Sequence, residues 1–284
     1  AVEATAQGSL ADDGAFSRAL GKMPEGQVAI GWANLEHLKQ QLTSGAGSEW
    51  FDGVDVKELS GDLTGQVLIG AQAASDGIEL RMRIGGTKTK PSIPLDVLPS
   101  LTSMPANTAV GVAVAPGSAG GSAVDLGGLT KALGTSGTDL VKAVVEAKLV
   151  TAILVPGSKA GVPAMKMAVD AQSQAAADLI AKNLQSISGS SQVKVDRNGT
   201  KTEVSTTGFP QGSGSLGDQQ QYRTAMAGMP SPAAAVLYLN VSSLFDATGG
   251  SAEDRRQLGP LKSLGVGLGL DDGDAVLLAR AVIQ

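Results

Sequence analysis

The chain has 284 residues, of which 42% are hydrophobic and 3% aromatic, and its formal net charge is −5. This length is sufficient for a large hydrophobic core, in one domain or two. Lysine and arginine form no basic stripe, and aromatic stacking platforms are scarce, which argues against nucleic acid as a partner. The absence of cysteine excludes disulfides, thiolate catalysis and cysteine-bound zinc. No run of 18 apolar residues is present, so the sequence predicts no membrane-spanning segment.

The dipeptide Met-Pro occurs three times, at Met23-Pro24, Met104-Pro105 and Met229-Pro230. Random placement of 7 Met and 12 Pro would give about 0.3 such pairs, so an internal duplication is the natural explanation. Each pair lies between a helix-like stretch and an apolar run, because proline ends a helix and favours extended backbone before it. The sequence therefore predicts a recurring unit of helix, Met-Pro and strand.

The first and third copies align without gaps, with Met23-Pro24 on Met229-Pro230. Asp12 and Asp218 precede the two helices, where a carboxylate is expected to cap free backbone N–H groups. In the first copy, Phe16, Leu20 and Met23 have helical spacing and share one helix face.

In both outer copies the strand after Met-Pro ends at an asparagine, Asn34 in the first and Asn240 in the third. Each asparagine lies where the strand gives way to a further helix. Asparagine caps helices well, so we expect a structural role for both residues and not a role in ligand binding.

Each copy then continues into a hairpin. Asp76-Gly77 and Asp272-Gly273 lie between apolar runs, which is a strong hairpin signal. In the middle copy a Pro-Gly-Ser turn at residues 156–158 indicates a hairpin formed by strands 151–155 and 164–169. An additional helix is predicted from about Ala171 to Ile187, followed by another hairpin around Asn198-Gly199.

Helix, strand, helix and hairpin thus recur in the same order. We predict an α+β fold in which the repeated units form mainly antiparallel sheets with helices packed on one face. The predicted divisions are a first repeat unit over residues 1–90, an elaborated middle unit over 91–210, and a third unit over 211–284 that pairs with the first.

The sequence contains few candidates for catalysis or metal binding. His37 is the only histidine and is expected to be solvated on a helix. The stretch 271–274, Asp-Asp-Gly-Asp, lacks the alternating ligands and distal glutamate of an EF-hand and is interpreted as a turn with solvated carboxylates. The stretch 212–217 fits G-x-G-x-x-G but follows no buried parallel strand, so it is interpreted as a linker. We therefore predict no catalytic, cofactor-binding or metal site, and we assign no residue to a ligand.

One predicted strand is unusual because Gly265, Gly267 and Gly269 alternate along it. One face of that strand is nearly bare. The pattern indicates close backbone packing, or room for something bulky to lie against it.

The third copy resembles a large actinobacterial family of envelope proteins of unknown function. The resemblance rests on 222–226 (Tyr-Arg-Thr-Ala-Met), on Met229-Pro230, on a strand ending 238–241, and on the closing stretch 258–265 with 280–282. It implies a membrane-anchored protein whose extracytoplasmic region corresponds to this chain. The family has no assigned activity, so the resemblance implies no functional residues.

Three functions are compatible with these features. The first is a non-catalytic scaffold or interaction module of the cell envelope, which predicts a contiguous exposed apolar patch. The second is a carrier or sensor that binds an apolar ligand such as a lipid in a cavity between sheets. The third and least favoured is a hydrolase, which predicts converging carboxylates with perturbed pKa values. The expected partners are a lipid or an envelope protein, with membrane attachment only through an anchor outside this chain and no cofactor.

Overall fold

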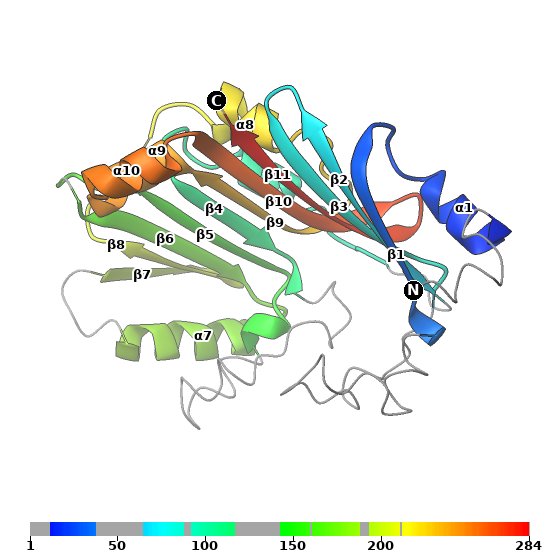
Figure 1. The fold of residues 1–284 in the computed structure, drawn as a ribbon. Coiled ribbons are helices and arrows are strands. Elements are labelled where there is room, and N and C mark those ends of the chain that lie inside the picture. Colours follow the sequence, from blue (N-terminus) through cyan, green and yellow to red (C-terminus); the bar gives the residue numbers. More distant parts are fainter. Residues whose placement is uncertain are drawn as a thin grey trace, which may run out of the picture.

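The computed structural model describes residues 12–37, 65–87, 92–116, 143–187 and 193–283, except 160 and 211. These residues form one antiparallel sheet of eleven strands (Figure 1). The strands are β1 (Gln27–Asn34), β2 (Gln66–Ala74), β3 (Gly77–Gly85), β4 (Val110–Val114), β5 (Leu149–Pro156), β6 (Pro163–Asp170), β7 (Val193–Asn198), β8 (Lys201–Thr206), β9 (Ala233–Asn240), β10 (Leu261–Asp271) and β11 (Asp274–Ile283). Their order in the sheet is β1-β2-β3-β11-β10-β9-β4-β5-β6-β8-β7.

The predicted α+β arrangement of several sheets with helices packed on one face is wrong. Strands take up 44% of the described residues and helices 27%, and the strands belong to one sheet. The reason is that the units join edge to edge, β3 with β11 and β9 with β4. Each junction satisfies the backbone groups that an exposed strand edge would leave unpaired, so no second sheet begins there. The predicted boundaries between units remain a prediction.

The helices of the described residues are short, with one exception. Most have five to eight residues, whereas α7 has fourteen. Figure 1 shows the sheet arched, with α8 on its outer side and α7 on its inner side. The helices are α1 (Gly14–Leu20), α4 (Leu98–Thr102), α7 (Gln174–Ile187), α8 (Gln220–Ala225), α9 (Val241–Thr248) and α10 (Ala252–Leu258), with a 3-10 turn at Leu216–Asp218.

The recurring unit of helix, Met-Pro and strand is confirmed in all three copies. A helix precedes each Met-Pro pair and a strand follows it: α1 and β1, α4 and β4, α8 and β9. The role of the two asparagines is also confirmed. The Oδ1 atom of Asn34 accepts from the backbone N–H of Glu36 and His37, and that of Asn240 accepts from Ser243.

The predicted helix caps at Asp12 and Asp218 are wrong, because other residues occupy the two N-cap positions. Asp13, one residue later than predicted, accepts from the first N–H groups of α1. Asp218 ends the 3-10 turn instead, where its carboxylate accepts from the backbone N–H and hydroxyl of Ser215. The extra turn before α8 moves the start of that helix beyond Asp218, so Gln219 occupies the cap position.

The four predicted hairpins are confirmed as β2–β3, β5–β6, β7–β8 and β10–β11. The predicted additional helix is α7, which begins at Gln174 and not at Ala171. Its first turn is capped by the Ser173 hydroxyl, which accepts from Ala176 N.

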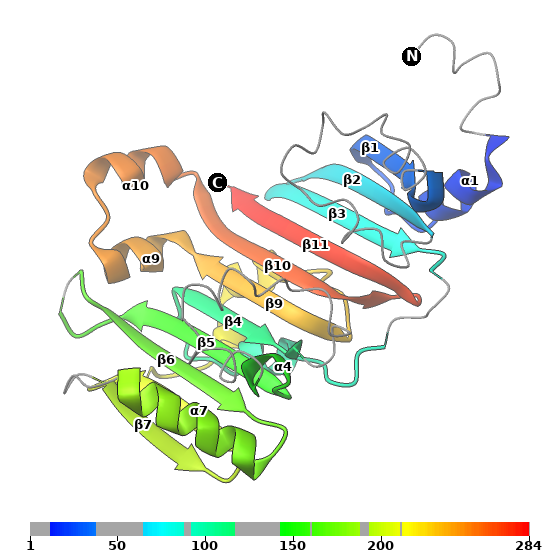
Figure 2. The same ribbon diagram turned by 90° about the horizontal axis from the view of Figure 1, so that it is seen from below.

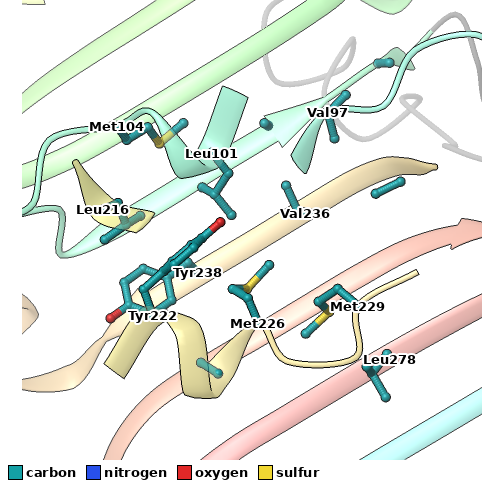
Figure 3. Close-up of a cluster of buried hydrophobic side chains, with 14 of the residues drawn as sticks. Val97, Leu101, Met104, Leu216, Tyr222, Met226, Met229, Val236, Tyr238 and Leu278 are labelled. Atoms are coloured by element: carbon teal, nitrogen blue, oxygen red, sulfur yellow. The ribbon is translucent and has the colours of Figure 1, made fainter. Parts of the chain in front are cut away.

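The main hydrophobic core lies between the middle of the sheet and the Met-Pro segments (Figure 3). Tyr238 of β9 is fully buried and meets Tyr222 of α8 edge to face, with ring centroids 5.2 Å apart. The Tyr222 hydroxyl lies 2.9 Å from the Thr102 hydroxyl. Burial raises the pKa of Tyr238 to about 12, although the Asn240 side chain opposes the shift, so the phenol stays neutral inside this core.

The alternating glycines of β10 provide the close packing that the sequence indicates. A Cβ atom on Gly265 would lie 2.3 Å from the carbonyl oxygen of Ala225, and one on Gly267 would lie 2.7 Å from the sulfur of Met229. The backbone of α8 and the third Met-Pro segment therefore rest directly on the β10 backbone. This packing also places Leu264, Val266 and Leu268, the residues between the glycines, on the other face of the sheet.

Replacing Gly265 by alanine is expected to lower the free energy of unfolding by about 2 kcal/mol, because the added methyl group meets backbone that must shift. Chemical denaturation measures this loss. The matched control is Gly31→Ala on β1, where nothing lies within 4 Å of the added carbon. Equal stabilities for the two variants would contradict the close contact.

Candidate functional site: the apolar face of the sheet

The two faces of the sheet differ in composition along their whole width. In an antiparallel sheet, directly opposed residues point to the same face, so the strand register defines rows of side chains that run across the strands. One row crosses all eleven strands and contains only apolar residues. This middle row is Ala29, Ala71, Leu80, Ala279, Val266, Leu237, Val112, Ala152, Met167, Val204 and Val195.

Two further rows flank the middle row on the same face, each two residues away along every strand. Both are apolar from β2 to β6. The first row is Ile69, Met82, Leu277, Leu268, Ala235, Val114, Val150 and Val169. The third row is Ala73, Ile78, Ala281, Leu264, Leu239, Val110, Leu154 and Met165. We call these three rows the apolar face.

The opposite face carries the charged residues of the same strands. Arg81, Arg83 and Glu79 of β3 alternate with the apolar residues, as do Arg280 of β11 and Lys166 of β6. Helices α4 and α8 and the Met-Pro segments cover the middle of this charged face. In most sheets the apolar face packs against the core and the charged face meets solvent. Here the face with the charged residues packs against the main core, and the apolar face is the more open one.

Several large side chains of the apolar face are exposed to solvent. The exposed fraction is 51% for Leu80, 48% for Ile69 and 55% for Met165. These residues lie on β2, β3 and β6, so the exposed area extends over most of the sheet. Exposed apolar side chains that gather on one face mark an interaction surface when the patch exceeds a few hundred Å².

At one end the apolar face is hollowed into a cavity of about 380 Å³. Its lining is almost entirely apolar and comes from β4 to β8. Met165 and Met167 contribute flexible side chains that adapt to irregular shapes. The lining residues on this face are Val110, Val112, Ala152, Leu154, Met165, Met167, Val193, Val204 and Thr206.

Helix α7 lies beside this cavity without lining it, and the two share Met167 as a neighbour. Its residues Ala177 and Ile180 are buried against Val169 of β6, with Val150 and Met167 packed beside them. The helix therefore lies over β7 and β8 and buries the first row at Val169 of β6. Figure 2, seen from below, shows α7 in front of β6 and β7.

The charged residues on the other face form a compact ionic cluster beside α1. Arg83 is buried and pairs with Asp271 and with Asp274, the latter at 3.0 Å. Lys22 Nζ lies 2.7 Å from the Asp274 carboxylate. That hydrogen bond raises the pKa of Lys22 above its ordinary value of 10.5, so this pair's contribution to stability is lost only as the pH rises through the raised pKa.

This cluster does not have the features of a hydrolase site. A carboxylate that acts as acid or nucleophile needs a free oxygen facing a cleft, whereas Asp271 and Asp274 are held by cations. The carboxyl groups with lowered pKa values, Asp218 and Asp254, owe the shifts mainly to hydrogen bonds from Ser215 and Ser251 at helix starts. Within the described ranges, no three His, Asp or Glu residues are grouped as metal ligands.

The residues considered from the sequence do not converge. His37 is exposed next to Asn34. The turn at 271–274 differs from the predicted set of solvated carboxylates, because Asp272 is well exposed and Asp271 half exposed, whereas Asp274 is largely buried and engaged by Arg83 and Lys22. The stretch 212–217 contributes Ser215 and Leu216 to the packing of the 3-10 turn.

Sequence reasoning missed the apolar face, although its signal is present. The strand 78–84 reads Ile-Glu-Leu-Arg-Met-Arg-Ile and the strand 264–268 reads Leu-Gly-Val-Gly-Leu. Both alternate large apolar residues with charged residues or glycine. The alternation identifies the two faces of each strand, but not whether the apolar face meets a second layer.

No protein-family model, curated protein or solved structure matches the chain. No helix of the described ranges combines the length and apolar composition needed to cross a membrane.

Proposed function

We propose that the protein is a non-catalytic binding protein of the cell envelope whose apolar face receives an apolar ligand such as a lipid. The observation that carries the proposal is the unbroken apolar row over eleven strands together with the cavity beside α7. Because the strands form one sheet, the ligand binds on an open arched face and not in a cavity between sheets. The envelope location rests on the sequence resemblance.

Covering the exposed side chains of this face supplies the binding energy. Each large aliphatic side chain contributes about 1 kcal/mol when the exposed half of its surface is removed from water. Five such residues, Ile69, Ile78, Leu80, Met165 and Leu268, are exposed on the face.

Native mass spectrometry of the protein purified from its own host without detergent tests the proposal. We expect a mass above that of the polypeptide, and we expect solvent extraction to release a lipid and restore the polypeptide mass. The extracted protein should regain lipid from vesicles. A polypeptide mass before extraction, with no uptake from vesicles afterwards, contradicts lipid binding.

The runner-up is a scaffold or interaction module, which the exposed apolar surface also favours. In that case an envelope protein covers the face, and the same purification yields a stoichiometric protein partner and no lipid. The cavity beside α7 favours the lipid, because a protein partner has no need of a hollow lined with methionine and valine.

A further inference from the structure

A small polar pocket lies on the charged face of the sheet, beside α1. Its volume is about 200 Å³, and it is located where β2 begins and β3 ends. Three of the described residues that line it are cations and one is a carboxylate, so we call it the cationic pocket. The lining residues are Arg18, Ala19, Lys22, Gln66, Leu68, Arg83, Gly85, Gly86 and Asp274.

The strand register explains why the sheet is hollow at this point. Gln66 of β2 and Gly85 of β3 are directly opposed, so they belong to one face of the sheet. A Cβ atom on Gly85 would lie 2.8 Å from Oδ1 of Asp274. Because Gly85 has no side chain, space remains between Gln66 and Asp274, and α1 closes this space from one side.

Three hydrogen-bond donors of the cationic pocket have no acceptor in the described part of the chain. Arg83 is 5% exposed, and its Nε–H is buried without a partner. The amide oxygen of Gln66 accepts from the indole N–H of Trp32 at 3.3 Å, which leaves the Gln66 NH2 group unused. Arg18 makes neither a hydrogen bond nor an ion pair. A buried donor without an acceptor is unfavourable, so these donors favour a ligand that supplies oxygen atoms.

The charges of the lining also favour an anion. Oδ2 of Asp274 lies 2.7 Å from Lys22 Nζ and 3.0 Å from the Arg83 guanidinium, so two cations share this carboxylate. The other two aspartates of the turn 271–274 are not among the lining residues. Arg18 adds a third cation that no described carboxylate neutralises.

We propose that the cationic pocket binds a phosphate group, either as inorganic phosphate or as part of a small phosphate monoester. A phosphate group carries up to about two negative charges and offers three acceptor oxygens, which suits three donors from three elements better than the two oxygens of a carboxylate. Guanidinium groups bind such oxygens through paired N–H donors. The volume is smaller than the ~300 Å³ at which pockets for larger organic ligands begin, so the rest of a monoester extends into solvent.

Nuclear magnetic resonance titration of the full chain tests this site. Sodium phosphate should cause saturable shifts of the Arg83 Nε–H signal and of the backbone N–H signals of Gly85 and Gly86, all with one affinity. Glycerol 1-phosphate should shift the same signals, and the tighter of the two compounds identifies the source of the phosphate group. Acetate should bind at least about tenfold more weakly, because it has one charge and two oxygens. Sodium chloride at equal ionic strength is the control for screening.

The variant Arg18→Gln removes the cation that has no partner. We expect phosphate to bind about tenfold more weakly, because one charge-assisted hydrogen bond is lost. The matched control is Arg223→Gln, since Arg223 is also an exposed arginine in the last turn of a short helix and donates to Gln220. It should bind phosphate like the unmodified protein. Circular dichroism checks the folding of both variants.

Three outcomes would overturn the phosphate site. The first is the absence of saturable shifts with both phosphate compounds. The second is an equal loss of affinity in the two arginine variants, which would show attraction to surface charge in general. The third is acetate binding as tight as phosphate binding. The cationic pocket and the apolar face lie on opposite faces of the sheet, so each outcome leaves the proposed lipid binding untouched.

Discussion

Replacing Arg83 by methionine is expected to lower the free energy of unfolding by about 3 kcal/mol, because it removes one of the two cations that hold the largely buried Asp274 carboxylate, together with the buried hydrogen bonds of Arg83 to Asp271. Arg83 is 5% exposed and donates to the Asp274 carboxylate at 3.0 Å and to the Asp271 carbonyl oxygen at 2.9 Å. Methionine retains the aliphatic volume of the arginine side chain, so the loss of stability measures the contribution of the positive charge and its hydrogen bonds. The free energy is measured by chemical denaturation.

Two comparisons define the origin of that loss. Arg256 on α10 is 76% exposed and pairs with Glu253, so Arg256→Met should cost less than about 0.5 kcal/mol. The double variant Arg83→Met with Asp274→Asn removes the carboxylate that has lost one of its two cations, and it should recover part of the stability. A small loss for Arg83→Met, similar to that of the α10 variant, would show that water compensates for the missing guanidinium.

The ionic cluster shows why some contacts were not predictable from the sequence. Arg83 and Asp274 are 191 positions apart and meet because β3 lies beside β11. Local signals placed both residues in hairpins but did not determine which hairpins are neighbours. Asp271 and Asp274 therefore resembled an ordinary turn with solvated carboxylates, whereas the turn supplies the anions for a buried arginine.

Short stretches of sequence carry local signals but do not show which distant strands are neighbours, and this explains how much of the fold and of the site is predictable. The Met-Pro units, the hairpins and the caps at Asn34 and Asn240 depend on neighbouring residues, so their signals are complete within short stretches. The joining of all units into one sheet depends on contacts between distant strand edges. For that reason alternating strands such as 78–84 were assigned to several sheets, and the open apolar face was missed.

Replacing Ile69, Leu80 and Leu268 together by glutamine is expected to weaken lipid binding by at least about a hundredfold. These three side chains lie in the first and middle rows on β2, β3 and β10, and all are exposed before a ligand binds. A bound chain must strip water from each new amide and cannot replace its hydrogen bonds, which costs about 1 kcal/mol or more for each amide. The sum of about 3 kcal/mol corresponds to the predicted change in affinity.

Stability should change much less than affinity in this variant, because glutamine keeps an aliphatic stem against the neighbouring strands and its amide reaches solvent. Titration with a fluorescent two-chain lipid measures the affinity, and thermal unfolding of the extracted protein measures the stability. Ile30→Gln on the opposite face is the matched control and should bind lipid normally. If the triple variant binds as tightly as the control, the apolar face is not the ligand site, and the scaffold function, with an envelope protein covering part of the sheet, becomes the better account of this exposed surface.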